Sequence, residues 1–233
     1  MSENGNHYSG SAAEFEAARR EMVARQIAGR GIETPRVLEA MSSVPRHLFV
    51  PPEHVWKAYA DEPLPIGEGQ TISQPYMVAA MADALSLDGR ERVLEIGAGS
   101  GYQAAVVSLL AREVIAVETH LVLAAATRER LHRLGFKNVR IEVGDGSLGW
   151  SPDAPYDAIL VTAAAPAVPP PLVEQLTDGG RLVLPVGSAE QQELIRLVKH
   201  GGRTIEKRLF ACRFVPLLGR YGWRQNLQGP PQG

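Results

Sequence analysis

The middle of the chain alternates short apolar runs with longer segments whose apolar residues recur at helical spacing. Five apolar runs have the length of buried strands: 92–96, 113–118, 139–143, 156–162 and 181–186. Three segments have the periodicity of helices: 102–111, 121–134 and 169–176. Strands that alternate with helices predict a parallel sheet with right-handed crossovers, and therefore an α/β fold.

The two ends of this region follow different patterns. Residues 193–200 and 204–212 alternate apolar and polar positions on either side of Gly201-Gly202, which predicts an antiparallel hairpin at one edge of the sheet. Near the N-terminus, Ser11 and Glu14 have the spacing of a capping box, which predicts a helix from there to about residue 29.

Two further helices are predicted before the first strand. Thr34-Pro35 is a cap followed by a first-turn proline, and starts a short helix that ends near Met41. Residues 75–85 carry apolar side chains at helical spacing. Between these helices, residues 51–74 are rich in proline and glycine and show little periodicity, which is typical of a functional loop.

These patterns divide the chain into one domain with a tail at each end. Residues 1–12 are predicted to be a flexible N-terminal tail, and residues 219–233 a frayed C-terminal tail. The domain between them, 13–218, has a helical and loop-rich first part, 13–90, and a second part, 91–218, that holds the sheet.

Composition narrows the class of protein. The chain has 233 residues, is 45% hydrophobic and 21% charged, and carries a net charge of −2, which indicates a globular protein without the basic surface of a nucleic-acid-binding one. No apolar stretch approaches membrane-spanning length, and no secretory signal is visible. Cys212 is the single cysteine, so no intrachain disulfide forms, and the histidines lack metal-binding spacing. We therefore expect a cytoplasmic protein without a metal, and a monomer.

The strongest candidate for chemistry is a glycine-rich loop that follows the first central strand. Gly97, Gly99 and Gly101 precede Tyr102, where the next helix begins. Glycines there let the backbone turn tightly beside a ligand. Glu118 ends the second strand, 21 residues after Gly97, where a carboxylate can accept hydrogen bonds from ribose hydroxyls.

The third central strand adds a similar element. Asp145-Gly146 follows it, where a side chain can reach an adenine edge. Each piece alone has another interpretation: a tight turn for the glycines, a solvated strand end for Glu118, and a common turn dipeptide for Asp145-Gly146. Together, at this spacing, they predict a site for a cofactor that contains adenosine.

The glycine spacing discriminates between cofactors. A dinucleotide site uses Gly-x-Gly-x-x-Gly, whereas here the third glycine, Gly101, comes one residue early and Tyr102 takes the sixth position. Glu95, just before the loop, suits an ammonium group better than a pyrophosphate, although it is also compatible with a half-exposed strand residue. The pattern favours S-adenosylmethionine over a nicotinamide cofactor.

Several separated motifs resemble the protein-L-isoaspartate (D-aspartate) O-methyltransferase family over roughly residues 20 to 218. The more specific ones are Gln70-Thr-Ile-Ser-Gln-Pro75 and Arg213-Phe-Val-Pro-Leu217. Others are 44–50, the glycine loop, 144–146, 157–164 and 179–187. The resemblance implies the Rossmann-like three-layer sandwich of S-adenosylmethionine-dependent methyltransferases, with the C-terminal antiparallel hairpin as an addition.

The resemblance also implies the reaction and its residues. The family methylates the free carboxylate of isoaspartyl residues in damaged proteins and peptides, and the ester then cyclises to a succinimide without the enzyme. Its active-site serine corresponds to Ser73, and the cofactor residues to the glycine loop and the acids named above. From the local pattern alone, Ser73 is more typical of a helix cap before Pro75.

Substrate contacts are less strongly indicated. Ile72, Val215 and Leu217 are candidates to line a groove for an extended peptide, although Leu217 equally fits a core position. The Thr71 hydroxyl is a weaker alternative to Ser73, and Arg46 is a candidate to attract a carboxylate.

Three other functions fit parts of the pattern. The first is a methyltransferase of this fold that acts on RNA or on a small molecule; its RNA form would show a basic face or an Asn-Pro-Pro-Tyr motif, and the sequence has neither. A non-catalytic reader of damaged peptides would have lost the glycine loop or Ser73, and both are intact. A nicotinamide oxidoreductase is disfavoured by the glycine spacing.

Overall fold

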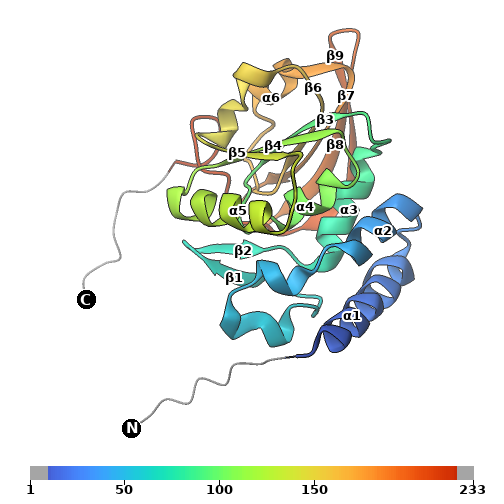
Figure 1. The fold of residues 1–233 in the computed structure, drawn as a ribbon. Coiled ribbons are helices and arrows are strands. Elements are labelled where there is room, and N and C mark those ends of the chain that lie inside the picture. The colour runs from blue at the N-terminus through green and yellow to red at the C-terminus, as the bar shows by residue number, and fades with distance from the viewer. Residues whose placement is uncertain (1–9, 225–233) are drawn as a thin grey trace.

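A sheet of seven strands forms the centre of the molecule, in the order β5-β4-β3-β6-β7-β8-β9 (Figure 1). The structure is a computed structural model that describes residues 10–224; of the tails predicted for 1–12 and 219–233, residues 1–9 and 225–233 lie outside the described residues. The strands are β3 (Arg92–Ile96), β4 (Glu113–Glu118), β5 (Val139–Val143), β6 (Tyr156–Val161), β7 (Leu176–Gly187), β8 (Gln192–His200) and β9 (Arg203–Cys212).

The pairing of these strands confirms the two patterns seen in the sequence. β5, β4, β3, β6 and β7 pair in parallel, whereas β7 pairs with β8, and β8 with β9, in the antiparallel sense. The β8–β9 hairpin turns at Gly201 and Gly202, which both have positive φ. Because parallel strands end at the same edge of a sheet, the segments that follow β3, β4, β5 and β6 gather at one edge.

The helices are α1 (Ala12–Glu21), α2 (Pro35–Ser43), α3 (Pro75–Leu85), α4 (Tyr102–Ser108), α5 (Leu121–Arg133) and α6 (Pro170–Glu174). The predicted capping box starts α1: Glu14 N donates to Ser11 Oγ, and Ser11 N donates to Glu14 Oε2 at 2.6 Å. A π-helical segment (Met22–Ile27) and a 3₁₀ turn (Ala28–Arg30) continue it. Thr34 is at the N-cap of α2, but its hydroxyl bonds Asp83 and does not cap the helix.

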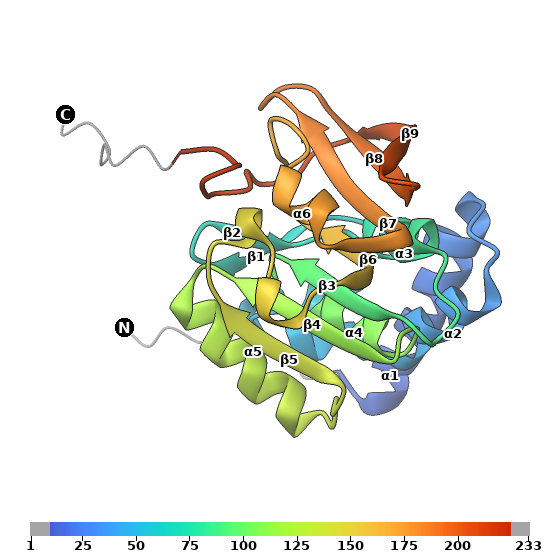
Figure 2. The ribbon, with the colours of Figure 1, turned by 90° about the horizontal axis from the view of Figure 1, so that it is seen from above.

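The molecule has three layers, and the two outer ones differ in thickness. Helices α3, α4 and α5 cover one face of the sheet, together with the N-terminal helices (Figures 1 and 2). The opposite face is covered by α6 and by 3₁₀ turns at Gly146–Leu148 and Ser151–Asp153. The predicted three-layer α/β sandwich is confirmed. Within residues 10–224, no helix is both long enough and apolar enough to cross a bilayer.

Alternation along β3 decides where its side chains point. Leu94 and Ile96 belong to the core on the α6 side, and Val93 belongs to the core on the helical side. Because successive side chains of a strand point to opposite faces, Glu95 lies on the helical side with Val93.

The segment 51–74 is more ordered than its composition predicts. It contains 3₁₀ turns before a separate hairpin of β1 (Leu64–Gly67) and β2 (Gln70–Ile72), which lies outside the large sheet. The turn uses Gly67, Glu68 and Gly69, all with positive φ. The sequence missed this hairpin because its strands are only four and three residues long, too short for a period of two to be visible.

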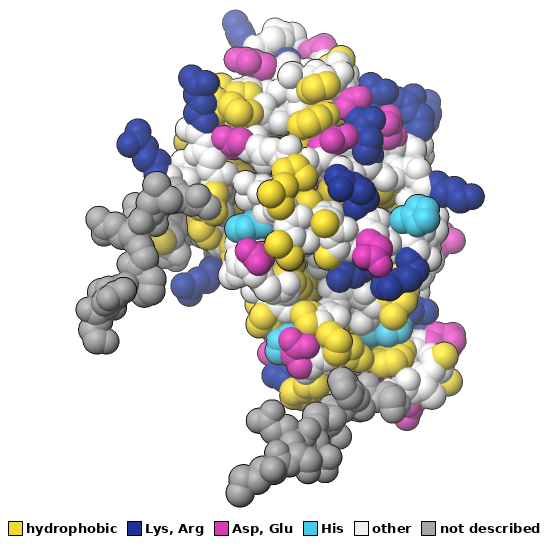
Figure 3. All heavy atoms as spheres, turned by 60° about the vertical axis from the view of Figure 1, so that its left-hand side comes forward, with side chains coloured by type: hydrophobic (Ala, Val, Ile, Leu, Met, Phe, Trp, Pro, Cys, Tyr) yellow, Lys and Arg dark blue, Asp and Glu magenta, His cyan; other side chains and the backbone are white. Residues whose placement is uncertain are grey.

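Charged side chains are interspersed on the surface. On the face drawn in Figure 3, lysines and arginines alternate with acidic side chains and with apolar areas. This distribution agrees with the net charge of −2.

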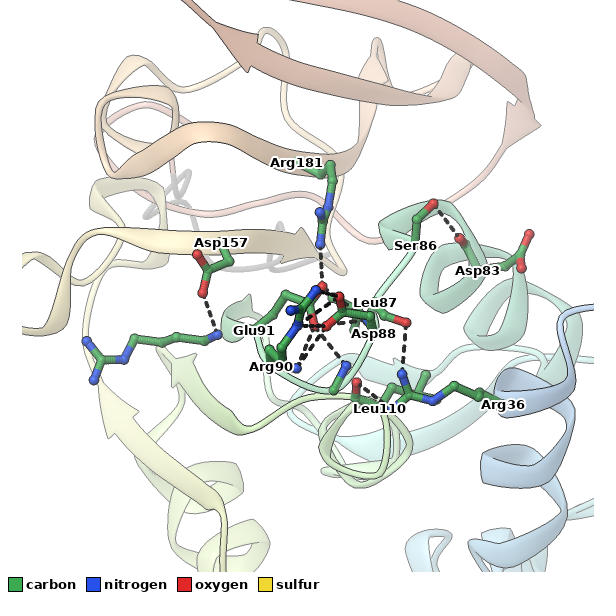
Figure 4. Close-up of polar contacts among 12 residues, drawn as sticks. Arg36, Asp83, Ser86, Leu87, Asp88, Arg90, Glu91, Leu110, Asp157 and Arg181 are labelled. Carbon is green, nitrogen blue, oxygen red and sulfur yellow. Dashed lines mark hydrogen bonds and ion pairs between the residues drawn. The ribbon is translucent and has the colours of Figure 1, made fainter.

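A buried carboxylate organises the turn that leads into β3 (Figure 4). The Glu91 carboxylate accepts hydrogen bonds from the backbone N–H groups of Asp88, Gly89 and Arg90, and pairs with the Arg181 guanidinium at 2.8 Å. Burial raises the pKa of Glu91, but the hydrogen bonds and Arg181 outweigh it and hold that pKa below its ordinary value. Glu91 therefore ties the start of β3 to β7.

We predict that Glu91→Ala lowers the free energy of unfolding at pH 7 by roughly 2–3 kcal/mol, because buried donors lose a charged acceptor. A carboxyl with a lowered folded-state pKa stabilises fully above its unfolded pKa of about 4.3, and this contribution is lost as the pH falls through the folded value. Urea unfolding should therefore show a difference between the proteins that narrows below about pH 4. Glu129→Ala, on the exposed face of α5, is the control; equal midpoints for Glu91→Ala and wild type would contradict the prediction.

Candidate functional site

The glycine loop connects β3 to α4 at the edge where the parallel strands end. Gly97 and Gly99 have φ values of 93° and 52°, which favour glycine. A Cβ on Gly97 would lie 2.5 Å from Thr162 Oγ1, so the loop packs directly against the end of β6. A Cβ on Gly99 would meet Ile66 Cδ1 at 3.4 Å, so β1 lies over the loop.

Glu118 holds this loop to β4. Its Oε2 accepts a hydrogen bond from Gly99 N at 2.8 Å, and its Oε1 accepts from Thr119 N and His120 N at 2.9 Å. The side chain is 4% exposed. A carboxylate has about four acceptor directions, so three donors leave room for a further hydroxyl. Glu118 thus shapes the loop and also faces the hollow beside it.

Two hollows lie at this edge of the sheet. The first, here called the glycine-loop pocket, includes Gly97, Gly99, Glu118, Gly146, Thr162 and Leu217 in its lining. The second, here called the serine cavity, has a volume of about 230 Å³, and its lining includes Thr71, Ser73, Gln74, Thr162 and Val215. A smaller hollow with Ile72, Ser73, Gly97 and Gly99 in its walls lies between them. Thr71 and Thr162 border all three, so the two main hollows are neighbours.

Ser73 does not cap the helix that follows it. Helix α3 begins at Pro75 with Gln74 at its N-cap, and it has no side-chain cap hydrogen bond. Among residues 10–224, the Ser73 hydroxyl has no hydrogen-bond partner, and it faces the serine cavity. The capping interpretation from the local sequence is therefore wrong, and the hydroxyl is free to bind a ligand.

Glu95 is a buried carboxylate without a partner. It is 0% exposed, and neither of its oxygens has a hydrogen bond. Burial, and secondarily the charge of Glu118, raises the pKa of Glu95 well above its ordinary value. A cationic group bound nearby would relieve both effects, so the site fits a positively charged ligand.

The segment after Leu218 is not the frayed tail that the sequence predicts, at least as far as residue 224. Arg220 N donates to Asp145 Oδ2 at 2.8 Å, and Tyr221 N donates to Ser147 Oγ at 3.0 Å. Asp145 Oδ1 also accepts from Ser147. The predicted tail therefore packs on the turn after β5, because Asp145 offers it a carboxylate.

The same segment forms a wall of the glycine-loop pocket. Leu217 N donates to Ala164 O at 2.8 Å, and Trp223 N donates to Leu217 O at 2.7 Å. Trp223 Nε1 reaches the same Ala164 carbonyl. Residues 215–218 line the pocket, and Leu217 is buried. The segment 215–224 therefore closes the pocket between the ends of β6 and β5.

Two predicted residues lie away from the pocket. Tyr102 is 1% exposed, its ring packs edge-on against Phe49 at 5.4 Å, and it borders only the small hollow beside Ser73. Gly101 packs against α5, since a Cβ there would lie 2.7 Å from Thr127 Cγ2. These two residues shape the start of α4.

Arg46 is not at the serine cavity, contrary to the sequence expectation. It is 0% exposed, its Nε donates to Ala58 O at 2.7 Å, and its guanidinium lies 4.9 Å from the centre of the Tyr102 ring. Burial lowers the pKa of Arg46 to about 10. The short apolar segment around Arg46 folds under the N-terminal helices, which the local sequence did not indicate.

Thr162 is the residue that sequence reasoning missed. Its Oγ1 lies 2.7 Å from Gly97 O and 3.0 Å from Ile96 O, so it fastens β6 to the glycine loop. The sequence could have indicated it, because its hydroxyl side chain directly follows the buried strand β6, at the edge where ligands bind in such sheets. Within residues 10–224, no cluster of acidic, histidine or cysteine side chains is placed to hold a metal.

Sequence comparison finds close relatives. A sequence model described as protein-L-isoaspartate (D-aspartate) O-methyltransferase matches residues 17–222. A protein-L-isoaspartate O-methyltransferase of Methanoregula boonei is 56% identical over 88% of this chain and 94% of its own length. That of Geobacter metallireducens is 54% identical over 90% of this chain and 97% of its own length.

Solved structures give a concordant result. A protein-L-isoaspartate O-methyltransferase superposes with a TM-score of 0.79 at 29% identity, over 87% of this chain and 67% of that one. A protein of the same description from Plasmodium falciparum, solved with S-adenosyl-L-homocysteine, superposes with a TM-score of 0.74 at 26% identity, over 86% and 98% of the two chains.

We predict that Gly219→Ala detaches residues 219–224 from Asp145, because a Cβ there would lie 2.0 Å from Asp145 Oδ1. Limited trypsin digestion should then cleave after Arg220 at least about tenfold faster, since local opening exposes the bond. Gly201→Ala is a matched control, because that glycine also has positive φ but open space around its Cβ. Equal cleavage of the Gly219 variant and wild type would show that the contact does not hold the segment.

Proposed function

The chain belongs to the protein-L-isoaspartate (D-aspartate) O-methyltransferase family, and from that premise we propose which of its residues hold the methyl donor and the damaged peptide. The protein is a repair enzyme that moves a methyl group from S-adenosylmethionine to the free carboxylate of L-isoaspartyl residues.

The reaction depends more on orienting the substrate carboxylate and the methyl group than on acid–base catalysis. S-adenosylmethionine supplies, when bound, a methyl group on a positively charged sulfur. The accepting carboxylate has an ordinary pKa near 4 and is already ionised at neutral pH, so no side chain has to remove a proton. Holding two reactants in line lowers a barrier by on the order of 7–11 kcal/mol, and this is the task left to the protein.

The observation that carries the assignment is that Ser73 borders both the serine cavity and the small hollow beside the glycine loop. Its hydroxyl faces the serine cavity, has no partner among residues 10–224, and also borders the small hollow that opens to Gly97 and Gly99. A free hydroxyl at this junction can donate one hydrogen bond to one oxygen of the substrate carboxylate. The other oxygen is then left to attack the methyl group.

The glycine-loop pocket is proposed to hold the methyl donor. The unpartnered carboxylate of Glu95 suits its ammonium group, and Glu118 suits a ribose hydroxyl because one acceptor direction is left. Gly97 and Gly99 admit the ligand close to the backbone. Asp145 is proposed to bind the adenine edge.

The other predicted residues take supporting roles in this proposal. Gly146 borders the glycine-loop pocket, and a Cβ there would lie 2.4 Å from Ile96 Cγ2, so only glycine fits. Gly101 and Tyr102 act by packing at the start of α4. Ile72 and Val215 are proposed to contact the peptide, since Val215 borders both main hollows.

The remaining expectations stay predictions from the sequence. They are a monomeric state, a cytoplasmic location and the exclusion of nucleic acids as substrates. The division of the chain at residues 12, 90 and 218 is likewise kept as a proposal, except that residues 219–224 join the site. The mixed charges on the face drawn in Figure 3, with the net charge of −2, support the exclusion of nucleic acid.

The function is tested with a peptide that contains one isoaspartyl residue, beside its twin with an ordinary aspartyl residue. We expect methyl transfer from S-adenosylmethionine to the first and none above background to the second. Equal methylation of both peptides would contradict isoaspartyl repair as the function of this chain.

We predict that Ser73→Ala lowers turnover of the isoaspartyl peptide by a factor of about 5 to 150, the loss of one positioned hydrogen bond. Cofactor affinity and the melting temperature should stay near wild type, because the hydroxyl neither caps α3 nor lines the glycine-loop pocket. The control is Ser43→Ala at the exposed end of α2. Wild-type turnover with a lowered melting temperature would remove Ser73 from the mechanism.

We also predict that cofactor binding releases a proton from Glu95. Its raised pKa favours the protonated form in the free protein, and a bound ammonium group favours the carboxylate, so affinity should rise with pH. Calorimetry in buffers of different ionisation enthalpy measures the release. Glu95→Gln should abolish it and weaken binding; unchanged proton release in a folded variant would contradict the assignment.

A further inference from the structure

The serine cavity contains one charged side chain that the preceding assignments leave unused. Of the residues that line it, Arg213 alone is charged. It follows directly after β9, is exposed, and forms no ion pair within residues 10–224. Arg208, five residues earlier and within β9, pairs instead with Glu193 and Glu206. The cavity therefore carries an uncompensated positive charge.

The backbone beside Arg213 is held firmly. Phe214 N donates to Gln192 Oε1 at 2.7 Å, and Gln192 Nε2 donates back to Phe214 O at 3.3 Å. One residue further, Val215 O accepts from Ala164 N at 2.8 Å. Gln192 is 6% exposed, so this double hydrogen bond is shielded from water. The root of the arginine is thus fixed at the rim, while its side chain reaches solvent.

The neighbouring glycine-loop pocket has an acidic side chain in its lining, which makes this charge significant. Glu118 borders that pocket and opposes the approach of an anion. The substrate of the proposed function is a carboxylate. An exposed cation at the mouth of the cavity attracts such a group over a distance of about 8–10 Å at physiological salt.

We propose that Arg213 recognises the reacting carboxylate of the isoaspartyl residue before methyl transfer. The inference rests on the proposed function and adds a specificity residue to it. During transfer a carboxylate oxygen forms a bond to the methyl carbon, the carbon–sulfur bond breaks with its electron pair going to sulfur, and no proton moves. The ester is neutral, so its attraction to Arg213 is lost.

This loss of charge decides which kinetic constant Arg213 affects. The ion pair is strongest in the enzyme–substrate complex and weakens as the methyl group arrives, so it adds affinity and does not stabilise the transition state preferentially. Arg213 should therefore lower KM for the substrate without raising kcat. It also favours the charged substrate over the neutral product, which helps the ester to leave.

The experiment compares Arg213→Gln, Arg213→Lys and Arg203→Gln with wild type on an isoaspartyl peptide. Arg203 is the matched control, because it is exposed at the opposite end of β9. For Arg213→Gln we expect KM to rise by about 5- to 20-fold, with kcat within about twofold and a weaker dependence of kcat/KM on salt. Arg213→Lys should recover most of the KM, and Arg203→Gln should match wild type.

A second peptide ligand, without the carboxylate charge, distinguishes recognition of that charge by Arg213 from other contacts between Arg213 and the peptide. The same peptide with its α-carboxylate replaced by a carboxamide cannot be methylated and carries no charge there. Its inhibition constant should be equal for wild type and Arg213→Gln. A rise in that constant as large as the rise in KM, or an unchanged KM in Arg213→Gln, would overturn the inference.

Failure of this inference is distinguishable from failure of the proposed function. If wild type does not methylate the isoaspartyl peptide, the proposed function is wrong. If wild type does so and Arg213→Gln is indistinguishable from it, only the role of Arg213 is wrong. Cofactor affinity and melting temperature, measured for each variant, establish that it is folded; Arg213→Lys provides the comparison if the glutamine variant is not.

Discussion

Two buried carboxylates on neighbouring strands are the electrostatic constraint on which the rest of this site depends. Glu95 is on β3 and Glu118 ends β4, the strand paired with it, and both are nearly inaccessible to water. Burial, and secondarily the charge of Glu118, raises the pKa of Glu95, so an ionised Glu95 without a partner costs stability. Glu118 is compensated by three backbone N–H groups, whereas Glu95 has no partner. The raised pKa therefore favours the protonated form of Glu95 in the free protein, and a bound cationic methyl donor would favour its carboxylate.

The sheet topology explains why the two main hollows are neighbours. The ends of β3, β4 and β6 supply the glycine loop, Glu118 and Thr162, which together form the floor of the glycine-loop pocket. The small β1–β2 hairpin lies over that loop and delivers Ser73 at its exit. Residues 64–73, which show little periodicity in the sequence, therefore form a second wall, and Thr71 and Thr162 border both main hollows.

The C-terminal segment completes the enclosure and links three strand ends. Its backbone is fastened to Ala164 after β6 and to Asp145 after β5, while Val215 borders both main hollows. Asp145 is therefore both a candidate ligand for adenine and the anchor of a pocket wall. Arg213, on the same segment, gives the serine cavity a positive charge, whereas Glu118 gives the neighbouring glycine-loop pocket a negative one.

The sequence by itself determined most of the fold. Apolar runs and glycine stops predicted β3, β4 and β5 with the bounds that the structure has, because a buried strand needs only a local run of apolar side chains. The capping box of α1 and the turn at Gly201-Gly202 are equally local. The position of Ser73 came from its motif, since a short hydroxyl side chain has no periodicity that distinguishes a ligand from a cap.

Only the tertiary structure decided which polar groups are free and which are occupied. Arg46 is buried beneath the N-terminal helices, and Arg220 N, 75 residues away in sequence, reaches Asp145. Arg208 in β9 pairs with Glu193 and Glu206, whereas Arg213, directly after β9, borders the serine cavity. Burial and charge compensation depend on contacts between residues far apart in the chain. Local patterns of hydrophobic and polar residues do not predict such contacts.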